Sequence, residues 1–157
     1  MTPTAVILFD SDCGFCRWSL AALLGWDRGR HLRPAPIQGP EGERLLADLG
    51  RAERLRSWHL VTPSGRRYSG GAVLPPLLEL LPAGRPLARL AARFPRQLEL
   101  GYRAIAEHRP ILSRVVPAAA KRRADARIRE RGSLPSSTAG SCSLPRARGA
   151  FVRAERG

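Results

Sequence analysis

Two cysteines three positions apart, Cys13 and Cys16, come directly after a short apolar run near the beginning of the chain. The run, residues 5–9, is continuous and contains β-branched and aromatic side chains, so it predicts a strand buried on both faces of a sheet. After a polar turn at residues 10–14, apolar residues recur at helical spacing up to Gly25. We therefore expect Cys13 at the start of a helix that follows a buried strand.

The following residues continue this alternation of strands and helices. Pro34 and Pro36 each lack a backbone N–H, so the second strand is expected to lie at a sheet edge or to be shortened. The predicted segments are a strand at 31–37, a helix at 41–49, strands at 57–62 and 66–69 joined by a turn at 63–65, and a helix at about 72–81. Strand, helix, strand, helix, hairpin, helix is the order of a thioredoxin-like α/β domain, whose mixed sheet is covered by helices.

Three regions are expected along the chain. Residues 1–84 form the thioredoxin-like core, and residues 85–132 form a helical appendix packed on that core, interrupted by Pro95, Pro110 and Pro117. Residues 133–157 are rich in Arg, Ser and Pro and poor in large apolar side chains, which predicts a disordered tail.

Composition excludes several classes of protein. The N-terminus does not read as a signal peptide, and the longest apolar runs are far shorter than the roughly 20 residues that cross a bilayer. Three cysteines are too few for a disulfide-stapled secreted scaffold. We therefore expect a cytoplasmic protein without a membrane span. The formal charge of +14 comes almost entirely from arginine, which is typical of a GC-rich, here bacterial, genome.

The cysteine spacing at a helix N-terminus indicates thiol-disulfide chemistry. Exposed N–H groups and the helix dipole favour a thiolate at Cys13, which attacks a substrate disulfide, and Cys16 resolves the mixed disulfide. Asp10 is the candidate proton acceptor for Cys16, and Asp12 the candidate helix N-cap. Both acids also raise the pKa of a neighbouring thiol, so the net shift at Cys13 stays open. No cofactor or metal is expected.

Two other interpretations remain open. The cysteine pair is also a common zinc spacing, but zinc takes four ligands, and the remaining soft ligands, Cys142, His31, His59 and His108, form no second pair. Alternatively, the chain is a basic binding module whose cysteines are structural or hold zinc, with residues 121–131 contacting nucleic acid or an anionic surface. A solvated helix face explains that stretch better than binding does, so nucleic acid is not the expected partner.

The run of residues 6–18, with Asp10, Cys13 and Cys16 in an Asp-x-x-Cys-x-x-Cys pattern, resembles the DCC family of thiol-disulfide oxidoreductases. Two further stretches, residues 61–72 and 102–109, are similar to segments of that family. The resemblance implies a thioredoxin-like fold and disulfide exchange with a disulfide-containing protein or small-thiol substrate, regenerated by an unidentified reductant. Thioredoxins themselves place a cis-proline before their third strand, whereas residues 54–57 here contain none.

Overall fold

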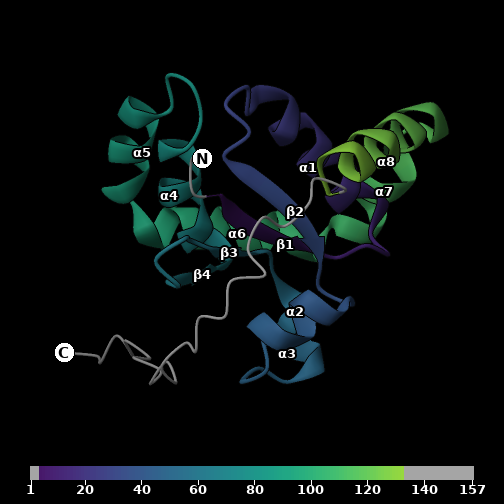
Figure 1. The fold of residues 1–157 in the computed structure, drawn as a ribbon, viewed down its shortest axis with the longest axis horizontal. Helices are drawn as coiled ribbons and strands as arrows, with labels where there is room; N and C mark the ends of the chain where they lie inside the picture. The colour runs from purple at the N-terminus through teal and green to yellow at the C-terminus, as the bar shows by residue number, and fades with distance from the viewer. Residues whose placement is uncertain (1–3, 133–157) are drawn as a thin grey trace.

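A four-stranded mixed sheet lies at the centre of the computed structural model, which describes residues 4–132 (Figure 1). Its strand order is β2-β1-β3-β4, with β1 parallel to β2 and the other neighbouring pairs antiparallel. The strands are β1 (Ala5–Phe9), β2 (Leu32–Pro36), β3 (His59–Val61) and β4 (Arg67–Ser69). β2 occupies a sheet edge, as its two prolines predict. The sheet and its helices confirm the predicted thioredoxin-like α/β fold.

Helices cover both faces of this sheet. In chain order they are α1 (Gly14–Trp26), α2 (Pro40–Leu45), α3 (Arg51–Arg56), the 3₁₀ helix η1 (Gly70–Val73), α4 (Leu74–Glu79), α5 (Arg85–Ala92), α6 (Pro95–Glu107), α7 (Arg109–Val115) and α8 (Ala118–Gly132). None of the helices within residues 4–132 is long and apolar enough to span a membrane.

Strand β1 separates two apolar clusters because successive side chains point to opposite faces of a sheet. Ile7 and Phe9 face α1, η1 and α4, where they pack with Leu20 among other buried side chains. Leu8 faces the opposite side and packs with Leu46, next to α2. Figure 1 shows α2 and α3 grouped together on one side of the sheet. Both faces of β1 are buried, as its continuous apolar run predicts.

The predicted helix at residues 41–49 is wrong in its extent. The chain forms α2, turns at residues 46–49 and begins a separate helix, α3, after Gly50 in an extended conformation. Helix α3 has six residues, none of them buried, so it carries no amphipathic signal. Side-chain hydrogen bonds attach α3 to its neighbours instead. Arg54 Nε donates to the Leu49 carbonyl, and His59 Nε2 bonds to the Arg54 carbonyl.

Prolines mark helix starts in the second half of the described chain. Pro95 is the first residue of α6, Pro110 the second residue of α7, and Pro117 immediately precedes α8. Proline suits these positions because the first turn of a helix lacks intrahelical acceptors for its N–H groups. The predicted interruptions therefore separate distinct helices. The expectation of a disordered tail at 133–157 falls outside the described residues.

Helix α8 packs along α1, and a buried ion pair fixes its end. Arg131 Nη2 donates to the Leu24 carbonyl over 2.7 Å and to the backbone carbonyl of Asp27, and lies 3.4 Å from Asp27 Oδ2. The Asp27 carboxylate is fully buried and also accepts from the N–H groups of His31 and Leu32. The C-terminal ends of α1 and α8 are thereby held together.

Candidate active site

Cys13 is the N-cap of α1, and Cys16 is the third residue of that helix. The backbone N–H of Cys16 donates a hydrogen bond to Cys13 Sγ over 3.3 Å, so the sulfur occupies the place of a capping oxygen. Cys13 is partly exposed, whereas Cys16 is 2 % exposed. The helix start predicted for Cys13 is confirmed, and the pair consists of one partly exposed and one buried cysteine.

The prediction that Asp12 caps α1 is wrong. Asp12 lies one residue before the N-cap, its side chain is exposed, and its Oδ2 accepts from Gln38 Nε2 over 3.4 Å. The cap position falls to Cys13 because its extended backbone aims the sulfur at the N–H of the third helical residue. Asp12 therefore faces the turn next to β2.

The pKa of Cys13 is lowered to about 6. The largest cause is the hydrogen bond from the Cys16 thiol, aided by the Cys16 N–H and the charge of Arg109, while burial and Asp10 act in the opposite direction. The pKa of Cys16 is raised, first by its hydrogen bond to Cys13 and then by burial. At neutral pH the site therefore holds one thiolate, Cys13, and one thiol, Cys16.

Asp10 directly follows β1 and shapes the turn that leads to Cys13. Its Oδ1 accepts from the Asp12 N–H over 3.0 Å and from Gln38 Nε2 over 2.6 Å. Gln38 Oε1 in turn accepts from the N–H and hydroxyl of Ser11. Gln38 follows β2, so the parallel pairing of β1 and β2 brings it to the turn. No local pattern in the sequence predicts that Gln38 binds Asp10 and Ser11.

The side chain of Arg109, the first residue of α7, extends to the buried Cys16. Its Nη1 lies 3.9 Å from Cys16 Sγ, and its guanidinium donates to the carbonyls of Leu55 and Arg56 at the end of α3. Tyr102 on α6 binds the same segment, since its hydroxyl accepts from the Trp58 N–H over 2.7 Å. Both residues lie in the 102–109 stretch that the sequence singled out only as a resemblance.

Gly14, between the two cysteines, allows α7 and α8 to approach the site closely. A Cβ built there would lie 2.7 Å from Ser113 Oγ and 2.8 Å from Lys121 Cε, both shorter than real contacts. Lys121 is the only lysine of the chain. The motif therefore contacts helices that lie about a hundred residues further along the chain.

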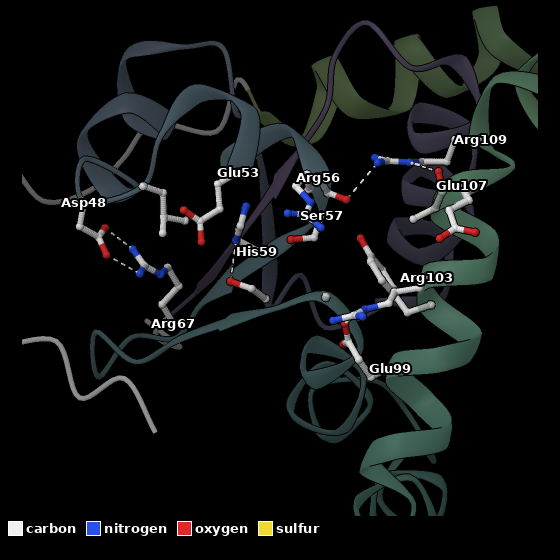
Figure 2. A pocket seen from close by; sticks show the side chains of 15 residues that line it. Asp48, Glu53, Arg56, Ser57, His59, Arg67, Glu99, Arg103, Glu107 and Arg109 are labelled. Atoms are coloured by element: carbon white, nitrogen blue, oxygen red, sulfur yellow. Dashed lines mark hydrogen bonds and ion pairs between the residues drawn. The ribbon is translucent and has the colours of Figure 1, made fainter. Parts of the chain in front are cut away.

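A pocket of about 1070 Å³ lies beyond Arg109 (Figure 2). The residues that line it include Arg109 and Arg56 but neither cysteine. Figure 2 shows the hydrogen bond between the guanidinium of Arg109 and the carbonyl of Arg56. His59 lies within it, bonded through Nδ1 to Ser69 Oγ and with its pKa lowered mainly by burial. Arg109 therefore stands between this pocket and Cys16.

Metal ligation is the other chemistry open to the cysteine pair. Within residues 4–132 no group of three or more His, Cys, Asp or Glu side chains is placed to hold a metal ion. Cys142, the one remaining cysteine, lies outside the described residues. The described part of the site thus offers a metal ion only the two cysteine sulfurs, with the cation of Arg109 beside them.

A thioredoxin-like sheet with a Cys-x-x-Cys pair at the N-terminus of its first helix defines the class of thiol-disulfide oxidoreductases. Comparison with protein families narrows this class, because the model of the DCC1-like thiol-disulfide oxidoreductase family matches residues 7–115. The chain belongs to that family. Neither the curated proteins nor the solved structures give a match.

Proposed function

We propose that this protein catalyses thiol-disulfide exchange with Cys13 as the nucleophile and Cys16 as the resolving thiol. The observation that carries the proposal is the placement of both sulfurs on the first turn of α1, where Cys13 Sγ is partly exposed and accepts the Cys16 N–H. A thiolate held at a helix N-terminus is the reactive form of cysteine. Its depressed pKa supports reaction at neutral pH.

The proposed reaction proceeds in two exchanges. The Cys13 thiolate attacks a substrate disulfide, forms a mixed disulfide and releases one substrate thiolate. Cys16 loses its proton and attacks Cys13, which releases the second substrate thiolate and leaves a Cys13–Cys16 disulfide. Asp10, half-buried at the end of β1, is the proposed acceptor of that proton. A cellular reductant then restores the dithiol.

We further propose a cytoplasmic protein whose substrate is a disulfide-containing protein or a small-thiol disulfide. Reducing conditions in the cytoplasm would keep the pair as a dithiol between turnovers. Electrons pass between sulfur atoms throughout, so the proposed reaction calls for no bound cofactor.

The alternative of a basic binding module is weakened by the contacts of residues 121–131. Arg127 donates to the Ala21 carbonyl over 3.2 Å, Arg131 binds the end of α1, and Asp125 pairs with Arg17 at 3.1 Å. Much of this stretch therefore holds α8 on α1. A nucleic-acid role would require the remaining arginines of the helix to act as phosphate contacts.

The proposed function is tested by mixing the reduced protein with an aromatic disulfide that releases a coloured thiolate. The Cys142→Ala protein should release two equivalents and become lighter by two hydrogens, because the Cys13–Cys16 disulfide forms. Adding Cys16→Ser should limit release to one equivalent and trap the mixed disulfide, and Cys13→Ser should abolish release. Exchange that persists in Cys13→Ser, or stoichiometric zinc in the purified protein, would contradict the proposal.

A further inference from the structure

We propose that Arg109 is a further catalytic residue, whose guanidinium stabilises the Cys16 thiolate while it resolves the mixed disulfide. This role rests on the exchange reaction proposed above. Arg109 contacts the reacting sulfur itself, with Nη1 3.9 Å from Cys16 Sγ. It lies 93 positions away in the sequence and reaches the site only because α7 packs against α1.

The guanidinium is held in place by neutral acceptors. Nη2 donates to the Arg56 carbonyl over 2.9 Å, both Nη atoms lie 3.4 Å from the Leu55 carbonyl, and Nε donates to the Ala106 carbonyl over 3.0 Å. Carbonyl oxygens carry no formal charge, so these bonds orient the fork without neutralising it. No carboxylate within residues 4–132 forms an ion pair with Arg109. The positive charge of Arg109 is therefore not neutralised by these contacts and lies next to the Cys16 sulfur.

The second exchange needs such a charge more than the first. Cys16 is 2 % exposed, and a thiolate formed in an apolar environment is costly unless an opposite charge lies close to it. In the mixed disulfide Cys13 is no longer a thiolate, so the hydrogen bond and negative charge by which Cys13 holds Cys16 protonated are gone. Burial and Arg109 then remain as opposing influences on the Cys16 thiol.

The other ionisable groups around the cysteines do not supply this charge. The charge of Asp10, which directly follows β1, opposes a thiolate at Cys13. Tyr102, from α6, has a raised pKa, first because of its burial, and is neutral at neutral pH. Lys121, from α8, approaches Gly14 with its side-chain carbons. Among residues 4–132, Arg109 is the cation that contacts the Cys16 sulfur.

The chemical step is balanced without proton transfer to Arg109. Cys16 gives its thiol proton to the proposed acceptor, Asp10, its thiolate attacks Cys13 Sγ, and the Cys13–Cys16 bond forms as the bond from Cys13 to the substrate sulfur breaks. The electron pair of the broken bond leaves on the substrate thiolate, and Asp10 then passes the proton to solvent. The guanidinium of arginine keeps its proton in proteins, so Arg109 acts through its charge and its donated hydrogen bonds.

Rapid mixing with the aromatic disulfide separates the two exchanges as two phases of thiolate release. In the Cys142→Ala background we expect Arg109→Met to slow the second phase about tenfold and to move its pH midpoint upward by about one unit. The first phase, measured at pH about 8 where Cys13 is ionised, should change much less. Arg109→Lys should restore part of the second-phase rate, and Arg114→Met, an exposed arginine of the same helix, is the matched control.

The outcomes distinguish this role from the function on which it rests. A wild-type protein that releases no thiolate overturns the proposed exchange and the role of Arg109 with it. Two normal phases in wild type together with an unchanged second phase in Arg109→Met overturn the role of Arg109 alone. Equal slowing in Arg109→Met and Arg109→Lys, with the pH midpoint unmoved, would show that Arg109 only supports the fold.

Discussion

The backbone N–H of Cys16 donates to the sulfur of Cys13 over 3.3 Å, so the proposed nucleophile caps the helix that carries its own resolving thiol. A thiolate at this position accepts the hydrogen bond better than a thiol does, and the bond thereby favours ionisation. The same first turn of α1 therefore sets both the reactivity of Cys13 and the distance over which the disulfide closes.

Alkylation of the reduced protein with iodoacetamide should titrate Cys13 with a midpoint near pH 6. A thiol is ionised above its pKa, so the reactive Cys13 thiolate predominates above the midpoint. The alkylation rate should therefore fall as the pH drops through the midpoint. Cys16 should react far more slowly, since it is buried and its pKa is raised. Peptide mass mapping in the Cys142→Ala background identifies the modified residue. A midpoint near about 8.5, that of a free cysteine, would contradict the prediction.

Substitution of Cys16 should raise the pKa of Cys13. The Cys16 thiol is the largest cause of the lowering, so Cys16→Ala should move the alkylation midpoint upward, while the backbone N–H preserves part of the effect. Cys16→Ser is the matched variant, because its hydroxyl also donates a hydrogen bond and should leave the midpoint lower than in Cys16→Ala. Equal midpoints in the two variants would remove the thiol hydrogen bond as the cause.

Asp10→Asn should lower the pKa of Cys13 because the negative charge of Asp10 opposes the thiolate. If Asp10 also accepts the proton of Cys16, the same variant should slow the second phase of thiolate release, with typical losses of about 10²-fold or more for a general base. Asp12→Asn, an exposed neighbour in the same turn, is the control. A lower midpoint with a normal second phase would restrict Asp10 to an electrostatic influence on Cys13.

Arg131→Met should destabilise the protein by about 3 kcal/mol, because it leaves the buried Asp27 carboxylate without its cation. Asp27 is fully buried and Arg131 only 6 % exposed. The control is Glu130→Gln, next to Arg131 in α8, which removes an exposed ion pair with Arg30. It should lower the free energy of unfolding by about 0.5 kcal/mol or less. Urea unfolding followed by circular dichroism measures both. Similar losses in the two variants would show that the buried pair contributes no more than a surface pair.

Local patterns predicted the elements that their own side chains stabilise. The apolar run at residues 5–9 became β1, and the turn at 63–65 became a hairpin turn in which Gly65 has a φ of +80°. Helix α3 was missed because Leu55 is its one large apolar residue and none of its six residues is fully buried, and its place depends on hydrogen bonds from Arg54 and His59. Asp12 was assigned the cap because capping usually falls to oxygen, whereas here a sulfur occupies that position.

The sequence by itself determined the strand, the turn, the helix start and the cysteine pair, since these depend on residues within one or two helical turns of one another. Only the tertiary structure decided what surrounds the pair. Gln38 reaches the turn through the parallel pairing of β1 with β2, and Arg109 reaches Cys16 across 93 positions through the packing of α7 on α1. Such contacts depend on how distant elements pack, and no local periodicity or spacing in the chain encodes them.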